Sequence, residues 1–193
     1  MQTPRAPQNK WRAILLAGVI PLVAYTVIED RYGVVWGLVA GMVFGVGEII
    51  WELITQKRVD PMTWGGNGLL LILGGVSLFT EEGIWFKLQP SLMEAAMALV
   101  LIATNILGRP LLLGIMAKQG LKPEKGSLVY GHLSGMNFRM GLFFGFHAVL
   151  AAWAAFHWST AAWAILKGVG FTLSMVVYMV VETLVLRYRI ASK

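Results

Sequence analysis

The chain has 193 residues, of which 57% are hydrophobic and 13% charged, with a formal net charge of +6. Soluble domains carry roughly a quarter charged residues and have too little interior to hide so many apolar side chains. The composition therefore excludes a soluble enzyme and predicts a protein whose solvent is lipid. Cysteine is absent, which excludes disulfides, thiolate metal sites and a cysteine nucleophile.

The N-terminal segment is polar and basic, with Arg5, Lys10 and Arg12 before an apolar run. We expect residues 1–10 to form a disordered cytoplasmic tail. The apolar run is long for a signal peptide, and no small-residue cleavage site follows it. It therefore predicts an uncleaved first membrane span over residues 11–28.

Apolar runs recur along the rest of the chain at lengths that suit a bilayer, which needs about 20 mostly apolar residues per helix. They predict an all-α, polytopic membrane protein with about six spans in one bundle, forming a single domain over residues 11–188. Ser91 and Glu94 follow Pro90 in the spacing of a capping box, which would begin the fourth span. A basic cytoplasmic loop is expected over residues 108–139. The six predicted spans are 11–28, 33–54, 62–79, 91–107, 140–158 and 161–186.

The distribution of basic residues between these runs predicts the orientation. With the N-terminus inside, 13 of the 16 lysines and arginines lie on the cytoplasmic side. Only Arg31 and Lys87 lie outside, and Lys167 lies within a span. Cytoplasmic loops of membrane proteins carry an excess of Lys and Arg. The asymmetry predicts both termini in the cytoplasm, and it explains the positive charge without any binding of nucleic acid.

Several short blocks, taken together and in order over about residues 15–188, resemble the bacterial intracellular septation protein A family of YciB type. These blocks are Lys57-Arg-Val-Asp-Pro-Met62, Leu73-Gly-Gly-Val-Ser-Leu-Phe79, Ile84-Trp-Phe-Lys87 leading to Pro90-Ser-Leu, Gly108-Arg-Pro-Leu111 and Leu166-Lys-Gly-Val-Gly170. The resemblance implies a multi-pass protein of the bacterial inner membrane. It implies a role in cell-envelope maintenance and septation, with contacts to division and wall-elongation proteins. The formation of a homo-oligomer is left undecided, and the lipid bilayer itself is an expected partner.

The second predicted span carries a stripe of small and acidic residues on one helix face. Gly37, Gly41 and Gly45 repeat every four residues, and Glu48 and Glu52 continue the same face. Small residues let a second helix approach closely in lipid, so the glycines predict a packing face. A charge deep in the bilayer is costly. We therefore predict that Glu48 is either functional or structurally paired. Glu52 lies nearer the membrane boundary, where its side chain is expected to reach water.

Further polar residues lie in the fourth and sixth predicted spans. Lys167 and Glu182 share one face of the last span, and Asn105 and Arg109 lie one turn apart near the inner end of the fourth. Lys167 alternatively snorkels to the outer headgroups, and Arg109 is alternatively a boundary arginine. We predict that the stripes of the second and sixth spans face the interior of one bundle. The candidate intramembrane network is Glu48, Glu52, Asn105, Arg109, Lys167 and Glu182.

No pattern of catalytic or metal-binding residues occurs in the chain. The three histidines, His132, His147 and His157, have no ligand spacing between them. We therefore expect no catalytic residue, no metal and no cofactor, and favour a non-enzymatic protein. The alternative is a small transporter or lipid-handling protein that uses Glu48, Lys167 and Glu182, with a membrane-embedded enzyme as a third class. A transporter needs a wet cavity lined by these charges, whereas a scaffold needs the charges paired.

Overall fold

The structure, a computed structural model, describes residues 20–80 and 83–192. These residues form helices and short connections, and no strand occurs among them. Five of the helices in this part of the chain are long and apolar enough to cross a membrane. The prediction of an all-α, polytopic membrane protein is confirmed. The predicted tail and residues 11–19 of the first predicted span lie outside the described residues.

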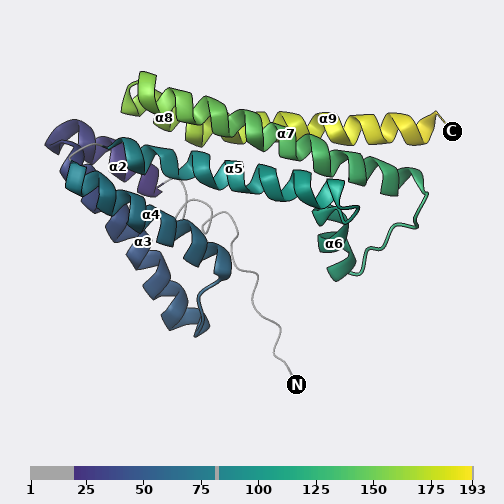
Figure 1. The fold of residues 1–193 in the computed structure, drawn as a ribbon, viewed down its shortest axis with the longest axis horizontal. Helices are drawn as coiled ribbons and strands as arrows, with labels where there is room; N and C mark the ends of the chain where they lie inside the picture. Colours follow the sequence, from purple (N-terminus) through teal and green to yellow (C-terminus); the bar gives the residue numbers. More distant parts are fainter. Residues whose placement is uncertain (1–19, 81–82, 193) are drawn as a thin grey trace. The chain divides into compact units, whose positions relative to one another are not determined.

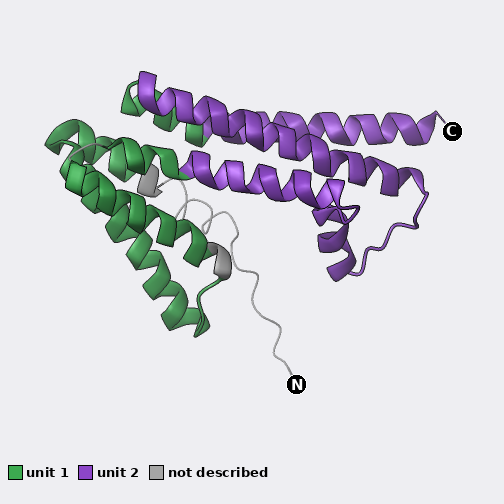
Figure 2. Ribbon diagram, in the orientation of Figure 1, with its two compact units in different colours: residues 1–89, 158–168 green, residues 90–157, 169–193 purple. Residues whose placement is uncertain are grey.

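The described helices divide into two compact units (Figure 2). Unit 1 comprises residues 1–89 and 158–168, and unit 2 comprises residues 90–157 and 169–193. The contacts group the described helices in these two sets, and the single bundle expected from the sequence stays a prediction.

Unit 1 begins with three consecutive helices, α2 (Ile20–Tyr32), α3 (Val34–Gln56) and α4 (Pro61–Thr80). Gly33, at φ 89°, connects α2 directly to α3, a backbone conformation that glycine adopts without steric cost. Figure 1 shows α3 and α4 running alongside each other as a hairpin. The predicted spans 33–54 and 62–79 match α3 and α4 to within two residues.

The first helix extends beyond its predicted end at residue 28. Helix α2 continues to Tyr32, so Glu29, Asp30 and Arg31 are helical rather than part of an outer loop. The reason is that Glu29 finds polar partners within unit 1, as described below. A charged triplet therefore does not end this helix.

Helix α5 (Ile84–Ile106) begins seven residues before the predicted fourth span and contains Pro90. The predicted capping box is wrong, because Ser91 lies inside the helix rather than at its N-terminal cap. The first turn is held instead by the backbone N–H of Phe86, which donates to Ser77 Oγ at 3.0 Å, and by Lys87 N–H, which donates to the Gly83 carbonyl at 3.1 Å. Proline lacks an N–H to continue this ladder, and the boundary between the two units falls immediately before it.

Unit 2 contains α6 (Leu111–Lys118), α7 (Leu128–His157) and the long last helix. Helix α5 ends at Ile106, and Gly108, at φ 68°, turns the chain before Pro110. The predicted loop 108–139 differs from the structure, since it contains α6 and the first turns of α7. The predicted fifth span, 140–158, is accordingly the second part of a 30-residue helix.

The last predicted span, 161–186, corresponds to three helical segments in direct succession. Helix α8 (Thr160–Ile165) leads into a π-helical turn, η2 (Leu166–Gly170), and then into α9 (Phe171–Ala191). Ser159 caps α8 by accepting a hydrogen bond from Ala162 N–H at 3.3 Å. The π turn places Lys167 in a wider helical coil, as such turns do where an extra residue is inserted.

Candidate functional site: buried polar clusters

The strongest polar contact in unit 2 joins α7 to α9. Arg139 Nε donates to Glu182 Oε1 at 2.6 Å, and Arg139 Nη2 donates to Glu182 Oε2 at 2.6 Å. The guanidinium fork thus meets both oxygens of one carboxylate, the geometry in which Arg–carboxylate pairs are strongest. Glu182 is the one buried residue of α9, with 6% of its surface exposed. The sequence predicted that Glu182 faces the interior, and the structure gives Arg139 as its partner.

His132 completes this cluster from two turns earlier on α7. Its Nε2 lies 3.3 Å from Glu182 Oε2, and the residue is 2% exposed. One turn before Glu182 on α9, the hydroxyl of Tyr178 donates to the Met136 carbonyl at 3.3 Å. The Glu182 carboxylate therefore accepts from Arg139 and lies against an imidazole, so α7 and α9 share a continuous polar seam.

The seam continues along both helices toward their other ends. Ser174 Oγ lies 2.9 Å from His147 Nε2, a hydrogen bond whose direction depends on the tautomer. Phe143 packs between these polar pairs, with its ring centroid 5.1 Å from Tyr178 and 6.0 Å from Phe171. Aromatic pairs at such centroid distances contribute favourable packing energy between the two helices. The predicted stripe of the last span therefore faces α7 through Ser174, Tyr178 and Glu182.

The length of α7 limits the depths in the bilayer at which the cluster can lie. At about 1.5 Å per residue, 30 residues extend about 45 Å, whereas the hydrocarbon core is about 30 Å thick. Arg139 is 18 residues before His157, or about 27 Å from that end. If α7 begins its crossing near His157, the ion pair lies at the opposite boundary of the hydrocarbon. A charge is less costly there than at the centre of the bilayer.

In unit 1, the two glutamates of α3 contact α4. Glu48 Oε2 accepts from Asn67 Nδ2 at 2.9 Å. Glu52 Oε1 accepts from the Thr63 hydroxyl at 3.0 Å, and its Oε2 accepts from Asp60 N–H at 2.9 Å. Carboxylate oxygens near a helix N-terminus satisfy donors that have no partner within the helix. Both glutamates therefore fasten the hairpin between α3 and α4, and Glu52 does more than reach water.

The glycine stripe of α3 lies against three different segments of unit 1. A Cβ added at Gly37 would lie 2.9 Å from Glu29 Cβ and 3.1 Å from the Tyr25 carbonyl of α2. One added at Gly41 would lie 2.7 Å from the Phe86 ring, and one at Gly45 would lie 3.2 Å from Asn67 Oδ1. These distances leave no room for larger side chains. The stripe predicted from the sequence is thus a close packing face in the structure.

A further cluster in unit 1 was missed by the sequence reading. Lys87 Nζ donates to Thr160 Oγ1, whose hydroxyl donates to Glu29 Oε1 at 2.8 Å, while Lys87 Nζ lies 3.7 Å from that same oxygen. The Lys87 and Glu29 side chains are only 13% and 12% exposed. Beneath them the Tyr25 ring stacks on Phe86 with centroids 4.4 Å apart. This outer cluster, Glu29, Lys87 and Thr160, joins α2, α5 and α8.

The other predicted network residues have separate surroundings. Arg109 is exposed after the end of α5. Asn105 Oδ1 is buried and has no hydrogen-bond partner among the described residues. Lys167 is half-buried in the π turn. Glu48 and Glu52 take their partners within unit 1, and Glu182 takes its partners within unit 2, so each carboxylate is held locally.

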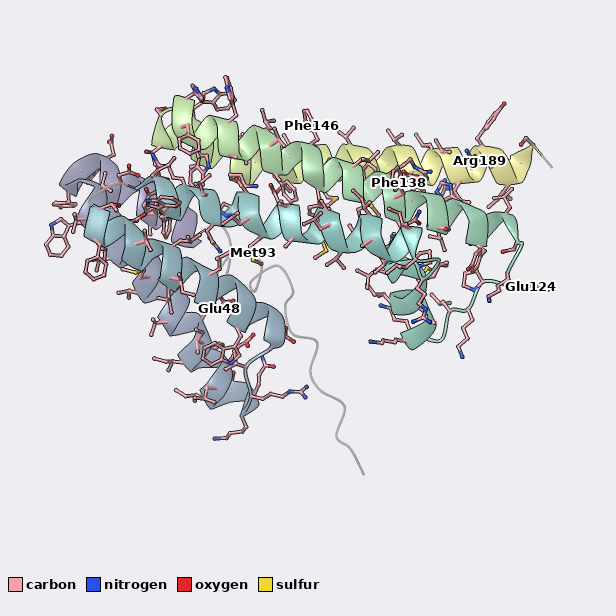
Figure 3. The ribbon with its side chains drawn as sticks, in the orientation of Figure 1. Glu48, Met93, Glu124, Phe138, Phe146 and Arg189 are labelled. Atoms are coloured by element: carbon pink, nitrogen blue, oxygen red, sulfur yellow. The ribbon has the colours of Figure 1, made fainter. Side chains whose placement is uncertain are left out.

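Within residues 20–80 and 83–192, no group of three His, Asp or Glu side chains is placed to hold a metal ion. The polar clusters are instead pairs and triads that link neighbouring helices. Chemically, they neutralise charge and satisfy donors inside an apolar protein. Figure 3 shows Glu48 on its helix, among the side chains of the α3–α4 hairpin.

Comparisons with known proteins place the chain among bacterial membrane proteins. The sequence model described as "Intracellular septation protein A" matches residues 14–193. An "Inner membrane-spanning protein YciB" of Paraburkholderia phymatum is 28% identical over 155 residues, covering 78% of this chain and 85% of that protein. A protein of the same name from Nitrosomonas eutropha is 25% identical over 172 residues, covering 89% and 92%. No solved structure matches the chain.

Proposed function

Because the chain belongs to the intracellular septation protein A family, we propose that it maintains the cell envelope and supports septation through contacts with division and wall-synthesis proteins. It is an inner membrane-spanning protein, like its relatives. In this role it is a non-enzymatic scaffold whose helices present surfaces to other membrane proteins. The family name supplies the process, and the local pairing of the intramembrane charges supports the scaffold.

The observation that carries this proposal is the pairing of Glu182 with Arg139 and of Glu48 with Asn67. Ionisable residues inside membranes mark transport pathways when they line water-filled cavities, and they are structural when they pair within the protein. Both of these carboxylates have partners on the neighbouring helix of their own unit. Their chemistry is thus used to hold helices together, which favours a scaffold over a transporter.

The proposal includes six spans with both termini in the cytoplasm. The described part of the chain supplies five apolar helices of spanning length, and the sequence predicts a sixth span in the apolar run over residues 11–28. The basic residues support this orientation. Reporter fusions after residues 31, 87 and 159 should report the outer side, and fusions after 58, 125 and 193 the inner side. An outer C-terminus would refute this topology.

The function is tested in the bacterium that carries the gene. Deleting the gene should lengthen the cells and increase envelope permeability, and the wild-type gene should restore both. A photo-crosslinking residue at an exposed lipid-facing position of α9, such as Val177, should capture division or wall-synthesis proteins. Normal division and envelope integrity in the deletion strain would contradict the proposal. A proton-coupled solute flux in liposomes that disappears in Glu48→Gln would establish the transporter instead.

A further inference from the structure

We propose that α6 and the basic residues around it form a binding surface for the headgroups of anionic phospholipids in the cytoplasmic leaflet. This surface, the α6 surface, consists of Leu111–Lys118 with Arg109, Lys122 and Lys125. The inference goes beyond the proposed function and rests on the topology proposed there, because that topology places α6 on the cytoplasmic side. It rests on the length and direction of α6, on its apolar side chains, none of which is buried, and on four cations without an ion-pair partner among the described residues.

Helix α6 lies within unit 2, between α5 and α7 in the chain. Its eight residues extend about 12 Å, far short of the hydrocarbon thickness. Figure 1 shows α6 turning away from the line of α5 and α7 instead of continuing it. Since α5 and α7 have the length and composition of membrane spans, a helix that turns away at their end runs along the membrane surface.

A buried side chain holds α6 in this position. Asn137 of α7 accepts from the Leu112 backbone N–H through Oδ1 at 3.1 Å, and its Nδ2 donates to the Leu101 carbonyl of α5 at 2.6 Å. Asn137 is completely buried. It thus joins α5, α6 and α7 with one side chain. The first turn of α6, which otherwise lacks partners for its N–H groups, is anchored to the inner end of the spans.

Helix α6 has an apolar surface that the rest of the protein leaves partly uncovered. Seven of its eight residues are Leu, Ile, Met, Ala or Gly, and none is buried in the structure. Ile115 is 44% exposed. A short helix with this composition at the end of membrane spans gains free energy by placing its side chains at the boundary between acyl chains and headgroups.

Positive charge flanks this apolar helix in the sequence. Four basic residues at exposed positions surround α6, whereas Glu124 is the only acidic residue between residues 108 and 127. No ion pair joins any of the four to an acidic residue in the part of the chain that the structure describes. By contrast, Arg139 nearby in sequence is neutralised by Glu182. The four basic residues are Arg109, Lys118, Lys122 and Lys125.

These three features fit an anionic lipid surface better than any single soluble partner. A membrane offers hydrocarbon for Leu and Ile side chains and phosphodiester groups for lysines in the same layer. The anionic cytoplasmic leaflet attracts basic segments next to membrane spans by about 1 kcal/mol, or about fivefold in affinity, for each Lys or Arg. An acidic protein or a nucleic acid would supply the negative charge without the hydrocarbon.

The first test measures the depth of α6 in the bilayer. The chain has no cysteine, so a single introduced cysteine can carry a spin label in the full-length protein in vesicles. Ile115→Cys should report an environment between two controls. These are Leu99→Cys, 69% exposed on the apolar α5, and Glu124→Cys, in the loop after α6. A label at 115 as accessible to water as the label at 124 would overturn the proposal.

The second test measures lipid selectivity with a fluorophore at the same position 115. Vesicles contain either brominated phosphatidylglycerol or brominated phosphatidylcholine in an otherwise identical mixture, so quenching reports which lipid lies beside α6. Phosphatidylglycerol should quench more strongly. The preference should fall about twenty-fivefold in Lys118→Gln/Lys122→Gln, at about fivefold per charge.

A matched variant, Arg58→Gln/Arg187→Gln, removes the same charge from two exposed arginines outside the α6 surface. It should keep the preference for phosphatidylglycerol. Equal quenching by both lipids in the wild-type protein would refute the binding of anionic headgroups. An equal loss of the phosphatidylglycerol preference in both double variants would show that net charge alone causes it, and would refute the proposed binding at the α6 surface. In a competition experiment, an acidic peptide or an oligonucleotide is added to the vesicles. Quenching by brominated phosphatidylglycerol that persists would confirm a lipid partner. Loss of this quenching would assign the surface to a soluble partner.

Discussion

The packing face of α3 in unit 1 and the interface between α7 and α9 in unit 2 hold helices together in two different ways. On α3, the glycines at 37, 41 and 45 let atoms of neighbouring segments approach so closely that they would contact a Cβ added at any of these positions. Between α7 and α9, larger side chains meet through a bidentate ion pair and hydrogen bonds. Lipid provides no hydrophobic drive for helix association. The chain therefore uses close contact in one place and polar bonding in the other.

This difference teaches which substitutions each region tolerates. Close packing fails when a side chain becomes larger, because surrounding atoms have nowhere to move. A polar interface fails when one partner is removed, because the other remains buried without compensation. Glu48 and Asn67 lie at the end of the glycine stripe, so α3 combines steric fit with one polar contact. Matched substitutions in the two regions separate the two mechanisms.

The largest effect is expected for Gly41→Leu. A Cβ at this position would lie 2.7 Å and 2.9 Å from two atoms of the Phe86 ring, and Phe86 is itself buried against Tyr25. The substitution should cost about 3 kcal/mol or more through overpacking, seen as a large fall in melting temperature in detergent. Gly47→Leu on the same helix is the control, because nothing lies within 4 Å of a Cβ there. An equal fall in melting temperature for Gly41→Leu and Gly47→Leu would refute the steric explanation of packing on α3.

A smaller loss is expected for Asn137→Leu in unit 2. The change removes the hydrogen bond from Leu112 N–H and the hydrogen bond to the Leu101 carbonyl. The Leu112 N–H, in the first turn of α6, then lacks its side-chain acceptor. The free energy of unfolding should fall by about 2 kcal/mol, the usual cost of an unsatisfied buried group. Asn105→Leu makes the same chemical change where Oδ1 has no partner among the described residues. Chemical denaturation of both variants in the same detergent compares them, and a larger loss for Asn105→Leu would contradict this assignment.

The smallest effect is expected for Glu48→Gln. Glutamine keeps the shape of the side chain, and its amide oxygen still accepts from Asn67. The charge-assisted bond becomes a neutral one, which is weaker by about 1 kcal/mol or less. Envelope integrity and cell length should stay close to wild type if the glutamate only fastens α3 to α4. A stable Glu48→Gln protein that fails to complement the deletion strain would show that the carboxylate acts in function.

The sequence predicted the local features of α3 well, because they depend on residues of one helix. The four-residue repeat of glycines identified the packing face, and the apolar runs located α3 and α4 to within two residues. The outer cluster could not be predicted, because Glu29 and Thr160 are 131 residues apart. Charges beside a predicted helix end were interpreted as solvent-exposed, and no local pattern revealed that Thr160 would bring a hydroxyl between Glu29 and Lys87.

Unit 2 shows why the helix boundaries were harder to predict. Residues 127–139 contain His132, Asn137 and Arg139, which lower the hydropathy and suggested a loop. Each of them has a buried partner that keeps the helix favourable, namely Glu182 for two of them and Leu101 and Leu112 for Asn137. Glu182, the shared partner of His132 and Arg139, lies on α9, 50 and 43 residues further along the chain. Helix α6 was likewise hidden by Pro110 and the lysines that follow it.

The coupling energy between Arg139 and Glu182 tests most directly whether the buried charges are structural. The measurement is a double-mutant cycle in detergent with Arg139→Met, Glu182→Leu and the double variant. Either single change should cost about 2 kcal/mol or more, since it leaves one charge without its partner, although Arg139 is 40% exposed and recovers part of this loss through water. The double variant should be more stable than the single variant Arg139→Met, because that single variant keeps the Glu182 carboxylate without its arginine partner. Additive losses, with no coupling between the two sites, would contradict the account.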